Sequence, residues 1–242
     1  MQLPKNWGSL TTNQFIELKA LKEEDFGSLF LYNLEVLSIV TDTDPEELED
    51  LSPEELVDYI YELNFLRREP SKSATEKIND LHFKPFMLLK LGEFIDLEYY
   101  FSNDFVSNLT NICALCYRKK SVNEWGVETF EPYRFNPSDR AYLFEYETIT
   151  NTYGVISEYL KFRAELMQSY ENLFMPDVED TGEELDPEDL KEEQEEKKFK
   201  KWGWEKVIYD LAGEDITKAD QITDLPLIMV LNFMSMKYEL QV

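Results

Sequence analysis

The chain has 242 residues, of which 43% are apolar and 31% charged, and its formal net charge at pH 7 is −26. This length and apolar content allow one substantial hydrophobic core, or a main core with a small appendage, and argue against global disorder. The negative charge argues against direct binding to DNA, RNA or anionic membranes, because phosphate groups are bound by clustered Lys and Arg side chains.

No signal for export or membrane insertion is visible. The first ten residues, MQLPKNWGSL, lack the basic and apolar regions of a signal peptide. The longest apolar run, residues 225–234, is too short to cross a bilayer. We therefore expect a soluble protein that is made in the cytoplasm.

Capping residues predict several helix starts along the chain. Thr11 and Gln14 have the spacing of a capping box, in which each side chain bonds to the backbone N–H of the other residue. Elsewhere a capping side chain is followed by proline, which favours the first turn of a helix. This second pattern occurs at Asp44-Pro45, Ser52-Pro53, Asn136-Pro137 and Asp186-Pro187.

Apolar residues at helical spacing follow these starts, in four stripes within residues 26–37, 56–63, 105–116 and 155–174. Residues 81–91, LHFKPFMLLKL, are interrupted by Pro85 and predict a small β-hairpin. Residues 128–135 predict another short extended piece. The expected fold class is mainly α, a multi-helix domain with a minor β-hairpin and a C-terminal helical extension.

An acidic run marks the expected domain organisation. Residues 177–198 hold twelve acidic residues and three lysines. We expect a helical core domain over residues 1–174, and an acidic loop with the start of a solvated helix over residues 175–198. Residues 199–242 would then form a C-terminal helical segment that packs on the core or on a neighbouring subunit. That segment is predicted to contain a helix ending at Gly213 and a nearly all-apolar helix over residues 222–236.

Few residues have the pattern of a chemical site. Cys113 and Cys116 form a CxxC inside an apolar helical stripe, with no further ligands at zinc spacing, so two buried thiols are favoured over a redox or zinc site. His82, the sole histidine, has no nucleophile or metal-ligand pattern around it and is expected in the hairpin or on the surface. No glycine-rich phosphate loop is present. We therefore expect no catalytic residue, cofactor or metal, and a protein that is not an enzyme.

The candidate interface lies where lysines and tryptophans follow the acidic run. Aromatic residues beside lysines can stack on nucleic-acid bases, but the neighbouring acids favour an intrachain contact or an anchor in a protein interface. The interface residues that we expect are Lys200, Lys201, Trp202, Trp204, Glu192, Glu193, Glu195, Glu196 and Trp7.

Several segments, in this order, resemble a known family. They are LPKNWGSLTTNQFIEL (residues 3–18), EVLSIVTDTDPEELEDLSPEEL (35–56), LNFLRREP (63–70), LKLGEFIDLEYY (89–100), NLTNICALCYR (108–118), FEPYRFNPSDRAYLFE (130–145) and YLKFRAELMQSYENLF (159–174). Together they resemble small virion-morphogenesis proteins of tailed bacteriophages, especially of the crAss-like phages. The resemblance covers residues 3–174 and implies no catalytic residues.

Two roles follow from this resemblance. One is a structural protein of the virion, a head–tail connector or tail ring component, repeated as a homo-oligomeric ring and bound to portal, connector or tail proteins. The other is a tail assembly chaperone that is absent from the mature virion. In a ring, the basic stretch FKKW (residues 199–202) of one copy would meet the acidic run of the next.

A third possibility is an acidic DNA mimic that inhibits a basic DNA-binding protein. Mimicry needs acidic residues spaced along one rigid face. In this chain the acidic residues are spread over helix caps and one run, which disfavours the idea.

Overall fold

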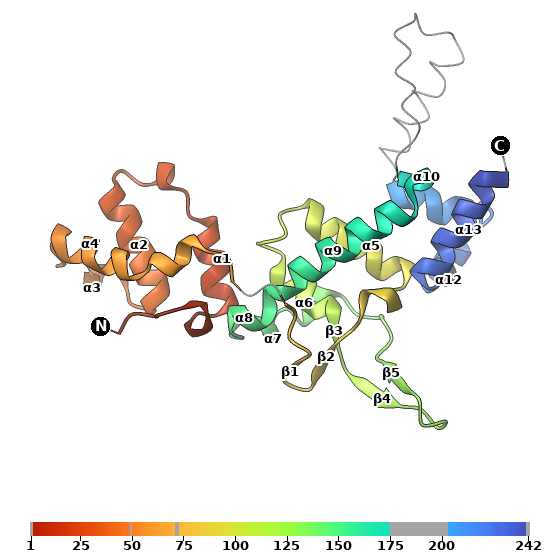
Figure 1. Ribbon diagram of the computed structural model, residues 1–242, viewed down its shortest axis with the longest axis horizontal. Helices are drawn as coiled ribbons and strands as arrows, with labels where there is room; N and C mark the ends of the chain where they lie inside the picture. Colours follow the sequence, from red (N-terminus) through yellow and green to blue (C-terminus); the bar gives the residue numbers. More distant parts are fainter. Residues whose placement is uncertain (1, 49, 71–72, 175–202, 241–242) are drawn as a thin grey trace, which may run out of the picture. The chain divides into compact units, whose positions relative to one another are not determined.

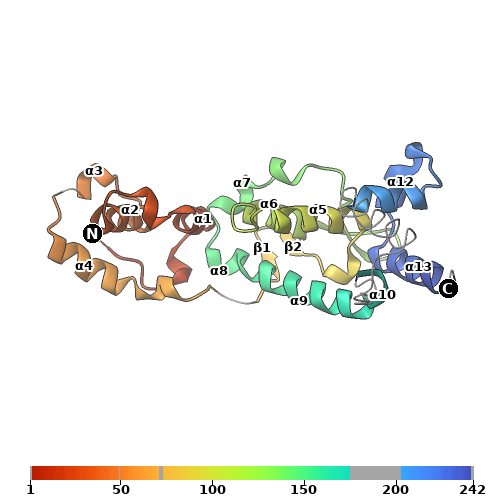
Figure 2. The same ribbon diagram turned by 90° about the horizontal axis from the view of Figure 1, so that it is seen from above.

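The computed structural model describes residues 2–48, 50–70, 73–174 and 203–240 (Figures 1 and 2). These residues are mainly helical and carry two small antiparallel sheets, so the predicted mainly α fold class is confirmed. Within these ranges no helix combines the length and the apolar character that crossing a bilayer requires.

The chain divides into two compact units, and the division differs from the expected boundary at residue 174. Unit 1 comprises Met1–Lys84 and Tyr99–Lys161, and unit 2 comprises Pro85–Glu98 and Phe162–Val242. Residues 162–174 group with the C-terminal segment through side-chain hydrogen bonds. The Tyr170 hydroxyl donates to Asn232 Oδ1 (2.8 Å), and the Asn172 amide donates to Ser235 Oγ (2.9 Å).

Unit 1 begins with short helices whose starts follow the predicted caps. The capping boxes of Thr11 with Gln14 and of Ser52 with Glu55 are both present, and Asp44 Oδ1 accepts the Glu46 N–H at 3.0 Å. The helices are η1 (Trp7–Ser9), α1 (Thr12–Ala20), η2 (Glu23–Asp25), α2 (Leu29–Thr41), α3 (Pro45–Leu48), α4 (Pro53–Glu62) and η3 (Asn64–Arg67). Figures 1 and 2 show α2 and α4, which contact each other, side by side.

Unit 1 continues through a small sheet and a buried helix. Antiparallel strands β1 (Lys77–Ile78), β2 (Leu81–Phe83) and β3 (Tyr117–Arg118) form the sheet in that order. Helix α6 (Leu109–Cys116) leads into β3 and is buried along its whole length. Three short helices, η5 (Pro137–Asp139), α7 (Tyr142–Glu145) and α8 (Ile149–Thr152), pack against α6.

The hairpin predicted over residues 81–91 was misplaced toward the C-terminus. It is formed by β1 and β2 around Asn79, whose φ of 53° supplies the left-handed turn. Beyond Pro85, which lacks a backbone donor, the chain forms η4 (Phe86–Leu88) instead of a strand. The extended piece predicted over residues 128–135 is present in part as β5 (Glu128–Phe130), which pairs with β4 (Lys120–Val122).

Unit 2 is a helical cluster. It contains η4, the first part of α5 (Leu91–Ser102), the later part of α9 (Gly154–Ser169), α10 (Glu171–Phe174), helical residues 203–211, η6 (Ile216–Lys218), α12 (Ala219–Thr223) and α13 (Leu227–Leu240). Two backbone hydrogen bonds join distant parts of the chain, from Leu91 N to Leu225 O and from Leu227 N to Leu89 O, both at 2.9 Å.

The C-terminal helices partly follow the prediction. Gly213 adopts a φ of 66° just after the helical residues 203–211, as expected for a glycine that ends a helix. The apolar helix predicted over residues 222–236 is wrong at both ends. Residues 219–223 belong to α12, and α13 starts after Pro226 and continues to Leu240. Proline favours a helix start and breaks a helix interior, which explains the division.

Candidate protein-binding surfaces

The expected interface residues fall into two groups. Lys200, Lys201, Trp202, Glu192, Glu193, Glu195 and Glu196 lie outside the described residues. Trp7 and Trp204 are described, and both contact residues of their own unit.

Trp7 was expected at a partner interface, but the structure places its side chain in the core of unit 1. It is buried and packs edge to face against Phe15 and Phe65, with ring centroids 5.4 Å away in each case. Its indole N–H donates to the carbonyl of Arg68 at 2.8 Å. A buried indole ring whose N–H has a hydrogen-bond acceptor is typical of a core tryptophan. The expectation that Trp7 is an interface residue is therefore corrected, because its side chain belongs to the core of unit 1.

Trp204 stands at the start of helical residues 203–211 and is half-buried in unit 2. Its ring lies edge to face with Phe94, at 5.4 Å between centroids, and with Phe174 at 6.5 Å. These contacts attach the C-terminal segment to α5 and α10 of the same chain. A role for Trp204 in holding a partner stays a prediction.

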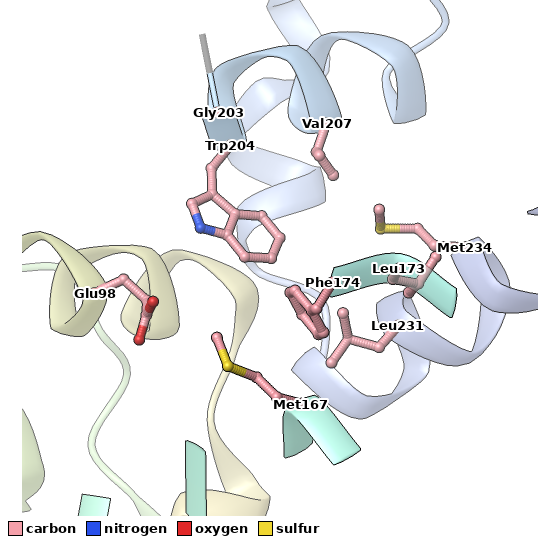
Figure 3. Close-up of a pocket in the computed structure, with 9 residues that line it drawn as sticks. All are labelled: Glu98, Met167, Leu173, Phe174, Gly203, Trp204, Val207, Leu231 and Met234. Atoms are coloured by element: carbon pink, nitrogen blue, oxygen red, sulfur yellow. The ribbon is translucent and has the colours of Figure 1, made fainter. Parts of the chain in front are cut away.

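Beside Trp204 lies an apolar cavity of about 170 Å³ within unit 2 (Figure 3). Figure 3 shows the Trp204 indole and the Phe174 ring near each other among the residues that line it, with Leu231 and Met234 on α13. Met167 and Val207 also line it. We call this space the unit 2 cavity. Its apolar lining suits an apolar or aromatic guest rather than a charged one.

The carboxylate that lines the unit 2 cavity is held by an ion pair. Glu98 accepts two hydrogen bonds from Arg163, from Nε to Oε1 at 2.7 Å and from Nη2 to Oε2 at 3.0 Å. A two-bond contact of this kind fixes the orientation of both groups. Glu98 therefore serves as part of a structural pair at the edge of the cavity.

A second apolar surface follows the outer side of α13. Met229, Phe233, Met236 and Leu240 are 49–78% exposed. Their spacing of four, three and four residues places them on one helix face, while Leu227, Leu231 and Met234 lie on the opposite side. We call the exposed set the outer α13 stripe. Its spacing is that of a helix that packs against another helix.

A third surface, which the sequence analysis missed, is the β4–β5 hairpin of unit 1. Its tip carries Trp125, which is 85% exposed, and Figure 1 shows the hairpin extending away from the helices of unit 1. The signal in the sequence was a five-residue loop, residues 123–127, that contains Gly126 and separates two short runs of strand-forming residues.

The two cysteines are free and buried, which confirms the prediction of buried thiols. Burial raises the pKa of the Cys113 thiol well above its ordinary value, and the neighbouring Cys116 raises it further. His82 lies half-buried on β2, in the hairpin. In the part of the chain that the structure describes, no three His, Cys, Asp or Glu residues gather in a way that could hold a metal ion.

Comparison of the chain with protein-family models, curated proteins and solved structures finds no match in any of the three.

Proposed function

We propose that this chain is a non-enzymatic structural protein of a tailed-phage virion, a head–tail connector or tail ring component that binds other virion proteins. The observation that best supports a binding role is the outer α13 stripe. The phage assignment comes from the resemblance of residues 3–174 to virion-morphogenesis proteins.

The outer α13 stripe fits a protein interface on physical grounds. Four large apolar side chains stay in contact with water on a helix whose opposite face already packs inside unit 2. A surface helix of a monomer usually presents charged or polar residues on that side. Contiguous exposed apolar residues typically mark a binding surface, because covering them with a partner removes apolar area from water.

The net charge of −26 narrows the kind of partner. Two such chains repel each other at long range, so a contact between copies needs a locally apolar surface to offset the repulsion. The outer α13 stripe has no charged residue among its four members. It is therefore suited to a neighbouring copy or to an apolar helix of another virion protein.

The decisive experiment is quantitative mass spectrometry of purified phage particles alongside the whole-cell lysate. A fixed ratio to the portal protein in the particle is the expected result for a connector or ring component. Absence from particles, with abundance in the lysate, would contradict a structural role.

A charge placed in the stripe tests the surface itself. Phe233→Glu should abolish incorporation into particles, or binding to the partner, while the chain stays folded by circular dichroism. Tyr61→Glu is the matched control, since Tyr61 is also a highly exposed aromatic residue on a helix, α4. Equal incorporation of both variants would show that the stripe is not the interface.

A tail assembly chaperone remains the second candidate, and the methionines of α13 favour it. Met229 and Met236 belong to the outer α13 stripe, and methionine is the side chain that adapts most readily to different apolar partners. A chaperone must hold a client and release it, which such a surface permits. The particle measurement above separates the two roles.

A further inference from the structure

We propose that Trp125, at the tip of the β4–β5 hairpin of one copy, inserts into the unit 2 cavity of a neighbouring copy. The inference rests on the proposed function, because a ring requires a contact that repeats from copy to copy. It assigns that contact to the tip of the hairpin and to the unit 2 cavity.

The tip of the hairpin is built to hold Trp125 outward. Asn123 Oδ1 accepts the backbone N–H of Trp125 at 3.0 Å and that of Val127 at 2.9 Å. Gly126 donates its N–H to the Asn123 carbonyl at 3.0 Å and adopts a φ of 75°, which a residue with a side chain rarely does. These hydrogen bonds define the conformation of the turn, in which the Trp125 side chain is exposed.

Among the described residues, the β4–β5 hairpin is a sheet of two strands only. Its three cross-strand pairs form a two-stranded sheet, with no third strand among the described residues. Val122 and Val127 flank Trp125 and are also exposed. Isolated two-stranded hairpins are marginally stable in water. Three exposed apolar residues on such a hairpin are better explained by a partner that covers them than by the stability of the monomer.

The unit 2 cavity has an apolar lining that suits an aromatic guest. Its volume of about 170 Å³ compares with the roughly 150 Å³ cavity that holds a benzene molecule in a protein core. Trp204 and Phe174 offer ring edges and faces to a third aromatic ring, and Met167 offers a thioether. Tryptophan is also among the residues that most often dominate binding at protein interfaces.

Charge favours the hairpin as the element that approaches unit 2. The described residues of unit 2 carry twelve acidic and five basic side chains. Residues 119–130 of the hairpin carry two lysines and two glutamates, so they are locally neutral in a chain of net charge −26. Lys119 and Lys120 at the base of the hairpin already pair with Asp80 and Glu128 of the same chain, so the hairpin approaches the acidic unit 2 as a locally neutral element.

The second copy is the occupant because both halves of the contact belong to this chain and differ from each other. A contact between two unlike surfaces is head-to-tail, and it leaves one free hairpin and one free cavity on every pair. Addition of further copies then continues the same contact, which forms a ring if the rotation between copies closes. No additional protein is required for this step.

The first experiment is sedimentation of the purified chain over a range of concentrations. Trp125→Ala should weaken self-association at least tenfold relative to the unmodified chain. Tyr146→Ala should not, although Tyr146 is as exposed in unit 1 and lies outside the hairpin. An unmodified chain that stays monomeric up to millimolar concentration, or a Trp125→Ala chain that associates normally, would overturn the inference.

A mixing experiment tests the direction of the contact. Met234→Trp fills the unit 2 cavity and keeps the hairpin, whereas Trp125→Ala keeps the cavity and removes the guest. Each variant alone should be monomeric, and a mixture should form one-to-one pairs and nothing larger, with circular dichroism confirming that both are folded. A mixture without pairs would mean that the tip binds elsewhere or that the chain's own residues fill the cavity, and either result contradicts the proposal.

The failure of this inference is distinguishable from the failure of the proposed function. If the protein occurs in particles at a fixed ratio but Trp125→Ala associates normally, the hairpin contact is wrong and the virion role stands. If Trp125→Ala is monomeric but the protein is absent from particles, the contact stands and the virion role is wrong.

Discussion

Trp204 packs edge to face against Phe94, with the ring centroids 5.4 Å apart and the ring planes at 88°. The two residues are distant in sequence, and their contact joins the C-terminal helical residues 203–211 to α5 within unit 2. Edge-to-face pairs of this kind add about 1 kcal/mol beyond the burial of the rings.

We therefore expect Trp204→Ala to lower the free energy of unfolding by about 2–3 kcal/mol. This is no more than the lower end of the range for large-to-small substitutions in a core, because Trp204 is only half-buried. Trp204→Phe should lose less, since it keeps an aromatic ring beside Phe94. Urea unfolding followed by circular dichroism measures both. Trp204→Ala with normal stability but weaker assembly would instead identify Trp204 as a partner anchor.

Gly154 provides a second stability prediction. A Cβ at this position would overlap the backbone of Ser73 and Ala74, which cannot move as a flexible side chain can. Gly154→Ala should therefore destabilise unit 1 by about 3 kcal/mol, as for strong overpacking. Gly27→Ala is the control, because an added Cβ there meets nothing within 4 Å. Similar melting temperatures for the two variants would contradict the close approach.

The ion pair of Glu131 with Arg140 predicts a dependence on acid pH. Two hydrogen bonds of 2.7 Å join the guanidinium to the carboxylate, and they hold the pKa of Glu131 below its ordinary value, against the smaller opposing effect of burial. A carboxyl group whose pKa is lowered by folding stabilises the fold above its unfolded pKa of about 4.3. This contribution is lost as the pH falls through the lower pKa of the folded state.

Glu131→Gln should therefore reduce stability at neutral pH by about 1 kcal/mol, because the pair is partly exposed. The difference from the unmodified chain should shrink below pH 4. Glu128→Gln, at the exposed pair with Lys120, is the control and should change stability less. The measurement is the difference in unfolding free energy between each variant and the unmodified chain, followed across pH. Taking this difference removes the general charge repulsion of the acidic chain, because it is common to all of them. A difference that stays constant down to pH 2 would count against the assignment.

The buried thiols predict slow chemical labelling. Cys113 and Cys116 are inaccessible in unit 1, and burial raises the pKa of the Cys113 thiol, so little reactive thiolate forms. A disulfide reagent should label neither cysteine at pH 8 in the folded chain and both in urea. Ser107→Cys gives a matched positive control, since Ser107 is exposed just before α6. Fast labelling of Cys113 under native conditions would show that α6 is open to solvent.

The sequence by itself determined the starts of several helices. Thr11 and Gln14 form their capping box as the spacing predicts, Ser52 caps the helix that starts at Pro53, and Gly213 ends its helix. The partners in each case lie within a few residues of each other, so the geometry depends on local chemistry alone. The burial of Cys113 and Cys116 was visible for a similar reason, because both lie on an apolar helical stripe.

Only the tertiary structure decided which distant segments meet. The pairing of His82 with Arg118, the contact of Leu89 and Leu91 with residues 225–227, and the burial of Trp7 depend on residues far apart in the chain. The pattern of side chains indicates that a segment has an apolar face. It does not indicate which other apolar segment packs against that face. Which segments meet depends on the balance between the packing energy that they gain and the entropy lost in closing the loops between them. As a result, Trp7 lies in the core and Trp125 is exposed.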